Sequence, residues 1–185
     1  MDQTVLDGAR RAIARYGWGE ATLARIADAA GVSRMTLHRH GITRKAILSS
    51  LAEELERAYR DAFWPALTSQ ASGVERLRLA LDAQCSVEDE YLDVSAALAA
   101  RGNDEVFHEP GEEALTRDAF VGPLRRILVD GCADGSLRDV EVDETATVLF
   151  NLVGWTYHHL RLGHGWPHER AARGVVEIAV QGVSA

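Results

Sequence analysis

Apolar residues recur at helical spacing along nearly the whole chain. Leu6, Ala9 and Ile13 follow one another at intervals of three or four residues, so they share one face of an amphipathic helix. Segments further along repeat this spacing, and none shows the strict alternation of apolar and polar residues that marks a half-buried strand. The pattern predicts an all-α protein.

Capping and breaking signals divide the first part of the chain into four helices. The expected starts of the second, third and fourth helices are hydroxyl side chains that can accept a hydrogen bond from a first-turn N–H group: Thr22, Ser33 and Thr43. The expected ends are breaks at glycine or proline: Gly17-Trp18-Gly19, Gly31, Gly41-Ile42 and Trp64-Pro65. The third helix is therefore short and runs from Ser33 to about His40.

The remainder of the chain also shows helical spacing. We expect helices over residues 74–87, 89–100, 112–133, 143–162 and 168–183. Pro123 should kink or break the third of these helices, Asp143 should cap the fourth, and residues 101–111 should form a polar loop. The sequence thus predicts two domains, residues 1–48 and residues 49–185.

The second and third helices form a helix-turn-helix pattern around Ala30-Gly31-Val32. Gly31 supplies the unusual backbone angle that the turn requires. The helix that follows presents donors such as Arg34 and Arg39, and it suits the major groove of DNA, where base edges can be told apart. The pattern therefore indicates a nucleic-acid-binding head.

The turn lies within a longer ordered set of residues: Gly17, Thr22, Ile26-Ala27, Ala30-Gly31-Val32-Ser33, Thr36-Leu37 and Leu48. This set, over residues 4–51, resembles the N-terminal domain of the TetR family of transcriptional regulators. The resemblance implies a three-helix helix-turn-helix domain followed by a helical domain for ligand binding and dimerisation. It implies a repressor that a small molecule releases from a palindromic operator in double-stranded DNA.

Four positions depart from the family pattern. His38 stands where the family usually has tyrosine, Met35 where glycine is frequent, and Gly41 where a core phenylalanine is usual. The family's phosphate-binding lysine falls on Arg44, with Lys45 next to it, and both place a positive charge beside a helix N-terminus. Loss of the phenylalanine should loosen the packing between the third and fourth helices, and so weaken DNA binding or alter its geometry.

The candidate DNA-binding residues differ in the part of the duplex that they suit. Arg34 and Arg39 suit guanine edges or nearby phosphates. Met35 and Thr36 suit the methyl group of thymine. The residues expected at the sugar–phosphate backbone are Thr22, His38, His40, Arg44 and Lys45. Ser33 completes the set at the start of the third helix.

By the same resemblance, residues 49–185 should bind a small molecule and form a homodimer through the last two helices. Small residues on those helices should allow close contact: Ala146, Gly154 and Ala179. Pocket candidates are aromatic or weakly polar side chains on the central helices: Phe63, Trp64, Leu81, Cys85, Phe120, Trp155, His158 and His159. The ligand is unknown, and release from DNA and co-repression are equally compatible with the sequence.

Charge is unevenly distributed between the two predicted domains. Residues 1–48 hold eight basic and four acidic side chains, a charge of +4, and the whole chain carries −8, which leaves −12 for residues 49–185. A basic head on an acidic body suits a chain of which only the head meets phosphate. The acidic run Glu88-Asp89-Glu90 is expected on a solvated face.

No motif of an enzyme or a metal site is present in the sequence. It lacks a nucleophile elbow, a P-loop, a dinucleotide-binding glycine pattern and a metal triad, so we expect no enzyme and no cofactor. Neighbouring histidines do not converge at zinc-ligand spacing, and the two cysteines form no CxxC pair. The alternative to the repressor is a helical dimer that binds a small molecule or a protein and has weakened or lost DNA binding.

The sequence also bears on location. No apolar stretch reaches about 18 residues, so no membrane span is expected. Residues 1–4 show neither the basic region nor the apolar core of a secretory signal. The expected location is the cytoplasm.

Overall fold

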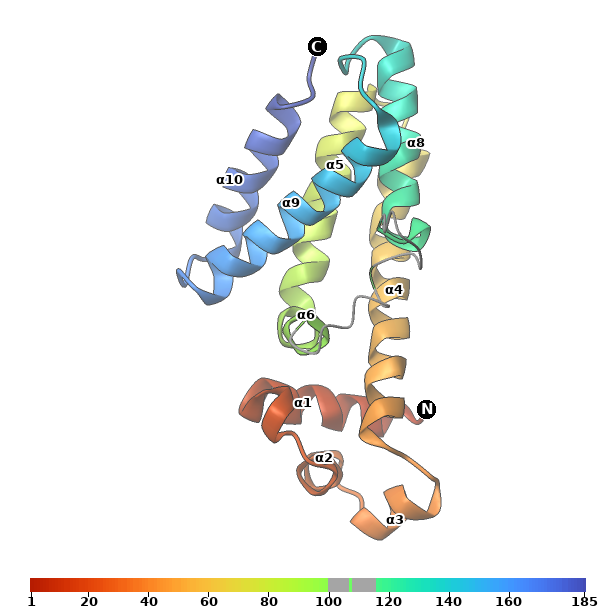
Figure 1. Ribbon diagram of the computed structural model, residues 1–185, viewed down its shortest axis with the longest axis vertical. Coiled ribbons are helices and arrows are strands. Elements are labelled where there is room, and N and C mark those ends of the chain that lie inside the picture. Colours follow the sequence, from red (N-terminus) through yellow and green to blue (C-terminus); the bar gives the residue numbers. More distant parts are fainter. Residues whose placement is uncertain (100–106, 108–115) are drawn as a thin grey trace. The chain divides into compact units, whose positions relative to one another are not determined.

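The structure, a computed structural model, describes residues 1–99, 107 and 116–185 of the chain (Figure 1). The chain divides into two compact units. Unit 1 contains Met1–Leu55 and the described part of Tyr91–Val106, and unit 2 contains Glu56–Glu90 and the described part of Phe107–Ala185. The domain boundary proposed after residue 48 stays a prediction, since one long helix passes through that position.

Unit 1 is built from α1 (Gln3–Glu20), α2 (Leu23–Ala30), α3 (Arg34–Arg39), α6 (Leu92–Ala99) and the first part of α4 (Arg44–Thr68). α1 packs against both α2 and α6. The apolar faces expected from the sequence meet in a core that includes Leu6, Ala9, Ile13, Ile26, Leu37 and Ile47. α1 and α2 approach so closely that a Cβ on Gly8 would lie 2.5 Å from the Cβ of Ala30, so only glycine fits there.

The predicted caps of unit 1 are confirmed. Each accepts a hydrogen bond from a backbone N–H of its first turn: Thr22 from Arg25 at 3.3 Å, Ser33 from Thr36 at 3.0 Å and Thr43 from Ala46 at 3.1 Å. Gly17 interrupts α1 as expected, with φ 70° and ψ 158°, although one more turn continues to Glu20. Signals within a few residues of each boundary therefore define these helices.

Unit 2 is built from the rest of α4 with α5 (Gly73–Glu90), α8 (Asp118–Asp134), α9 (Val142–Leu162) and α10 (His168–Gln181). α5 packs against α8, α9 and α10 and is the central helix of the unit (Figure 1). The core is rich in aromatic side chains and includes Tyr59, Phe63, Leu77, Leu81, Phe120, Phe150 and Tyr157. The described residues contain no strand, so the all-α prediction is confirmed, and an isolated bridge joins Leu137 and Ser184.

The end of α4 differs from the prediction. The helix does not stop near Trp64-Pro65 but continues to Thr68. The guanidinium of Arg76 donates to the carbonyl oxygens of Ala66 at 2.9 Å and Leu67 at 3.5 Å. These bonds satisfy carbonyl groups that the end of a helix leaves without partners, so the last turn holds despite the proline.

The helices after α5 agree with the predicted order but begin and end at different residues. α8 begins at Asp118 and runs through Pro123 as one helix, so the proline does not break it. Most of the predicted polar loop, and the first residues of the helix expected over 112–133, lie outside the described residues. None of the described helices is both long and apolar enough to cross a membrane.

The predicted cap of α9 was wrong. α9 begins at Val142 after Glu141, whose carboxylate accepts a hydrogen bond from the N–H of Glu144 at 2.7 Å. The carboxylate of Asp143 instead accepts one from the guanidinium of Arg125 on α8 at 2.5 Å. Asp143 therefore forms an ion pair with a residue of the preceding helix and does not cap α9, as its position in the sequence had suggested.

Candidate functional site

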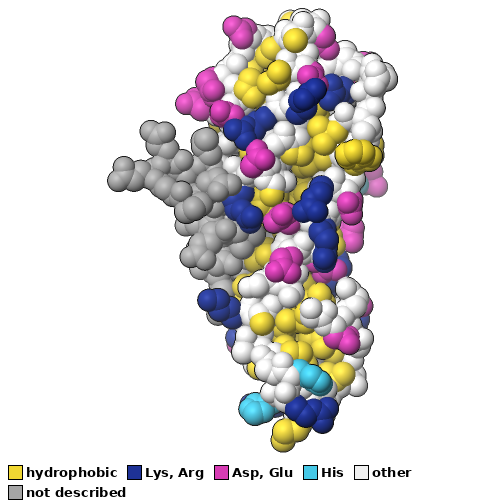
Figure 2. Space-filling model, turned by 90° about the vertical axis from the view of Figure 1, so that its right-hand side faces the viewer, with side chains coloured by type: hydrophobic (Ala, Val, Ile, Leu, Met, Phe, Trp, Pro, Cys, Tyr) yellow, Lys and Arg dark blue, Asp and Glu magenta, His cyan; other side chains and the backbone are white. Residues whose placement is uncertain are grey.

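Helix α3 presents most of its side chains to solvent. Leu37, only 1% exposed, anchors it in unit 1. Arg34, Met35, His38 and Arg39 are exposed on its outer face. Figure 2 shows basic and histidine side chains gathered at the end of unit 1 that carries α3. The structure therefore brings the central members of the predicted DNA-binding set onto one surface.

A glycine turn leads from α2 into α3. Gly31 has φ 69°, and its N–H donates to the carbonyl of Asp28 at 3.1 Å. The N–H of Val32 donates to the carbonyl of Ala27 at 3.0 Å. This pair of bonds is the Schellman motif, which favours glycine at the left-handed position. It confirms the role predicted for Gly31.

A second turn of the same kind ends α3. Gly41 has φ 64°, its N–H donates to the carbonyl of His38, and the N–H of Ile42 donates to the carbonyl of Leu37, both at 3.0 Å. Any other side chain at position 41 would have to adopt the same left-handed backbone. Gly41 also borders a groove of about 540 Å³ that Leu37 and Ile42 help to line. Looser packing between α3 and α4 remains a prediction.

Several polar groups of the predicted set already have partners within unit 1. Ser33 caps α3, and its hydroxyl lies 2.9 Å from that of Thr36. Nδ1 of His40 lies 2.9 Å from the carbonyl oxygen of Thr36 and donates to it, because a carbonyl can only accept. Thr22 caps α2. These side chains stabilise the ends of the helices, whatever else they contact.

The cationic side chains of the set are differently placed. Arg34, His38, Arg39 and Lys45 are exposed, and their side chains form no hydrogen bond or ion pair with another described residue. Unit 1 therefore has several hydrogen-bond donors on and beside α3 that bond to no other described residue. This arrangement can engage phosphate oxygens and base edges at the same time.

Arg44 is bound to its own unit. Its guanidinium lies 4.4 Å from the centre of the Trp18 ring and donates to the Trp18 carbonyl. The break at Gly17 places that carbonyl beyond the regular part of α1. Arg44 therefore connects the start of α4 to the end of α1, and Lys45 is the exposed cation next to it.

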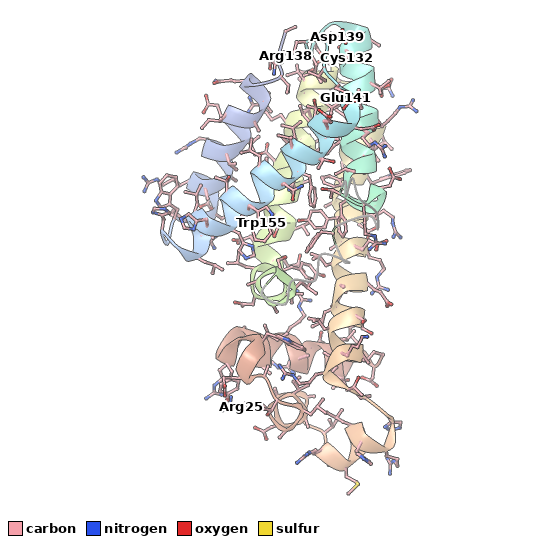
Figure 3. The ribbon with its side chains drawn as sticks, viewed as in Figure 1. Arg25, Cys132, Arg138, Asp139, Glu141 and Trp155 are labelled. Atoms are coloured by element: carbon pink, nitrogen blue, oxygen red, sulfur yellow. The ribbon has the colours of Figure 1, made fainter. Side chains whose placement is uncertain are left out.

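The eight predicted pocket residues in unit 2 divide into two groups. Four are fully buried: Phe63, Leu81, Cys85 and Phe120. Four are not: Trp64, Trp155, His158 and His159. Figure 3 labels Trp155 on α9. The ring centres of Phe63 and Phe120 lie 5.7 and 5.5 Å from that of Tyr59, so the structure brings these two together. Burial raises the pKa of the Cys85 thiol to about 12 and keeps it protonated.

Sequence reasoning missed a polar cluster inside unit 2. The Tyr59 hydroxyl donates to the carboxylate of Glu88, and burial together with that carboxylate raises the pKa of Tyr59 well above its usual value. Gln84 is fully buried, and its Nε2 donates to the carbonyl of Phe150 at 2.8 Å. The other polar atom of its side chain, Oε1, has no hydrogen-bond partner among the described residues. The Gln84 side chain therefore leaves one buried acceptor without a partner among the described residues.

The assignment of Glu88 to a solvated face was wrong, because its residue is only 6% exposed. A signal was present in the sequence. Gln84 and Glu88 continue the spacing of Leu77 and Leu81 along the buried side of α5. Polar residues on the apolar side of a helix are unusual, because buried polar groups need hydrogen-bond partners. These two residues therefore indicated a buried polar cluster.

The small residues on the last two helices are buried within one chain. A Cβ on Gly154 would lie 3.3 Å from both Gln84 and Glu88 of α5, and Ala146 and Ala179 are buried too. The expectation that they contact a second copy was wrong. The exposed apolar side chains on α9 and α10 are different residues: Val148, Leu152, Trp155, Leu162 and Ile178.

The histidines do not form a metal site among the described residues, where no group of three or more His, Cys, Asp or Glu side chains converges. The rings of His159 and His164 stack edge to face with centres 4.9 Å apart. Nδ1 of His168 lies 2.7 Å from the Tyr157 hydroxyl. That the protein uses no metal stays a prediction.

The sequence of the chain is similar to those of bacterial transcriptional regulators. Residues 5–50 match the family model of bacterial regulatory proteins, tetR family. Over 50 residues the chain is 42% identical to the HTH-type transcriptional repressor Rv1474c of Mycobacterium tuberculosis, a match that spans 27% of each protein. It is 27% identical to the HTH-type transcriptional repressor KstR2 of Rhodococcus jostii, over 97% of this chain and 89% of that one.

Solved structures share the fold. A putative transcriptional regulator from Saccharomonospora viridis, solved in complex with choline, superimposes with a TM-score of 0.78 at 20% identity, over 99% of this chain and 97% of that one. The TetR family regulator PfmR from Thermus thermophilus gives a TM-score of 0.74 at 19% identity, over 96% and 97% of the two chains.

Proposed function

Because residues 5–50 make this chain a member of the tetR family of bacterial regulatory proteins, we propose that it is a DNA-binding transcriptional repressor controlled by a small molecule. The observation that carries this proposal is the placement of α3. The helix is held by Leu37 and two glycine turns, and it presents unshared cationic side chains to solvent. A short helix of this kind suits the major groove.

The contacts with DNA divide between base edges and backbone. Arg34 and Arg39 read guanine edges or adjacent phosphates, because guanidinium groups can bind the two acceptors of guanine together. Lys45 and His38 hold the sugar–phosphate backbone. Arg44 supports them by fixing the start of α4 to Trp18. Thr22, Ser33, Thr36 and His40 contribute mainly by shaping the ends of α2 and α3.

The repressor works as a homodimer through α9 and α10. Val148, Leu152 and Trp155 follow one another at helical spacing on α9 and expose apolar surface, and Ile178 does so on α10. Pairing of these faces in two copies would bury that surface in a four-helix arrangement. Twofold pairing presents two copies of α3 to a palindromic operator, about 34–36 Å apart for successive major grooves.

The ligand binds in the interior of unit 2. Phe63, Phe120 and Tyr59 supply apolar rings, and Oε1 of Gln84 supplies an acceptor. We expect a mainly apolar molecule with at least one hydrogen-bond donor. Ligand binding shifts the population toward a conformer that no longer matches the operator, with α4 as the connection between the units. The protein has no catalytic role and acts in the cytoplasm.

Selection of bound fragments from random DNA tests the proposal. We expect a palindromic consensus, and binding that weakens linearly in a plot of log affinity against log salt. The absence of any selected sequence would leave the alternative of a dimer without DNA binding. A ligand that strengthens the selected complex instead of releasing it would make the molecule a co-repressor.

A further inference from the structure

Met35 is the most exposed large apolar side chain in the described part of the chain. It is 71% exposed, ahead of Ile178 at 70% and Trp64 at 63%. A methionine in this position leaves its side chain in water and adds nothing to the core of unit 1. The stability of the isolated chain therefore does not explain why a methionine stands at this position of α3.

The surroundings of Met35 favour one kind of occupant. Arg34, His38 and Arg39 are exposed around it on the same short helix. The cationic surroundings disfavour an apolar protein partner and favour a polyanion such as DNA. The patch thus combines one flexible apolar side chain with several donors.

Thr36 does not compete for the apolar role. It is half-buried, and its hydroxyl lies 2.9 Å from the hydroxyl of Ser33 at the start of the helix. Leu37 points into the core. Of the α3 side chains that could meet an apolar group in a groove, Met35 alone is fully available.

The major groove offers one apolar group, the C5 methyl of thymine, which distinguishes thymine from cytosine and uracil. The thioether of methionine is flexible and polarisable, so it can adapt its shape to such a methyl group. We propose that Met35 is a specificity-determining residue that contacts a thymine methyl group in each half of the operator. This inference rests on the proposed function as a DNA-binding repressor.

The test replaces single thymines of the selected operator by deoxyuridine, which removes only the methyl group. We expect one symmetry-related pair of thymines whose replacement weakens binding of the wild-type dimer about fourfold per half-site, the factor that corresponds to burial of one methyl group. Met35→Ala should bind the thymine and uracil operators equally. Anisotropy titrations of labelled duplexes measure both affinities.

Two control variants separate this role from general effects. Arg39→Ala should weaken binding to both operators by the same factor and keep the preference for thymine. Val129→Ala, a truncation of another exposed apolar residue on α8, should change neither affinity nor preference. Circular dichroism should show unchanged helical content in all three variants.

The possible results separate a failure of the role proposed for Met35 from a failure of the proposed DNA-binding function. If wild-type protein binds no DNA, both the inference and the proposed function fail. If it binds the selected operator but tolerates uracil at every thymine, or if Met35→Ala keeps the preference for thymine, the inference fails and the repressor stands.

Discussion

Unit 1 carries its candidate DNA-binding side chains on the outside, whereas the side chains proposed to bind a ligand in unit 2 are buried. Arg34, Met35 and Arg39 are exposed on α3, whereas Tyr59 and Glu88 are enclosed by the helices of unit 2. Changes on α3 should therefore alter binding with little effect on folding. Changes inside unit 2 should alter folding and ligand binding together, because the same atoms serve both.

The two units also differ in how their polar groups find partners. In unit 1 the caps of α2, α3 and α4 bond to backbone groups three residues away. In unit 2 Tyr59 bonds to Glu88 and Gln84 to Phe150, across tens of residues of chain. Local sequence thus determines the helix caps of unit 1, and tertiary packing determines the buried polar pairs of unit 2.

The largest expected effect is on the packing of unit 1. In Gly8→Val the new Cβ would lie 2.5 Å from that of Ala30, so α1 and α2 must separate, at a cost of about 3 kcal/mol in the free energy of unfolding. Urea unfolding measures the loss, and hydrogen exchange should rise in α1 and α2 but not in α8. Gly19→Val is the control, because nothing lies within 4 Å of that position. Equal stability of the two variants would contradict the close approach.

The next effect concerns binding alone. Arg39→Ala should lower operator affinity about a hundredfold in the dimer, since a contact of about 1–3 kcal/mol is lost in each half-site. The free energy of unfolding should not change. Arg57→Ala removes the same charge from an exposed site in unit 2 and should leave the affinity unchanged. Undiminished affinity and sequence preference in Arg39→Ala would refute the reading role of Arg39.

Tyr59→Phe tests the interior of unit 2. The Glu88 carboxylate would lose the donor that Tyr59 provides, and the free energy of unfolding should fall by about 2 kcal/mol. Tyr16→Phe, at a partly exposed tyrosine of unit 1, is the matched control and should be neutral. Thermal and urea unfolding of both variants provide the measurement. A neutral Tyr59→Phe would show that the buried bond adds nothing to stability.

A smaller effect is expected at the turn after α3. Gly41→Ala places a Cβ on a residue with φ 64°, and the left-handed backbone should cost about 1 kcal/mol. Gly19→Ala, at a position without a positive φ, should cost nothing. Operator affinity should fall in Gly41→Ala if the turn sets the angle of α3. Stability that does not differ between the two variants would mean that the turn can rearrange freely.

The smallest effect concerns acid stability in unit 2. A hydrogen bond from Arg76 lowers the pKa of Asp130, with a further contribution from Arg126. Because the pKa is lower in the folded state, this contribution is fully present above the unfolded pKa, near 4, and is lost as the pH falls through the folded pKa. Asp130→Asn should cost less than about 1 kcal/mol at pH 7.

The cost of Asp130→Asn should vanish as unfolding is measured at pH values falling from 5 to about 2. Asp139→Asn, at an exposed aspartate of the α8–α9 connection, serves as the control with a similar loss of charge. A cost for Asp130→Asn that stays constant over this range would contradict the pairing with Arg76.

Sequence was sufficient where the structure is decided locally. Thr22, Ser33 and Gly31 carry their signals within one helical turn, so the caps, the turn and the exposure of α3 were predictable. The chemical roles of the α3 side chains toward DNA remain predictions. They depend on a partner molecule and not on the folding of the chain.

Sequence was insufficient where distant segments meet. Asp143 looks like a cap until Arg125 is brought beside it, and Glu88 looks solvated until Tyr59 covers it. Trp64 and Phe63 are neighbours on α4, yet only Phe63 faces the core. A helix that packs against neighbours on more than one side carries apolar residues on several faces. The periodicity alone does not show which of these faces is buried.

The two glycine turns around α3 have a consequence for how such a regulator diverges after gene duplication. They hold the helix by its backbone, and Leu37 is the one side chain of α3 that the core needs. Positions 34, 35, 38 and 39 are therefore free of folding constraints. Under the proposed function, a daughter copy can acquire a new operator by substitutions at these four positions while it keeps its stability.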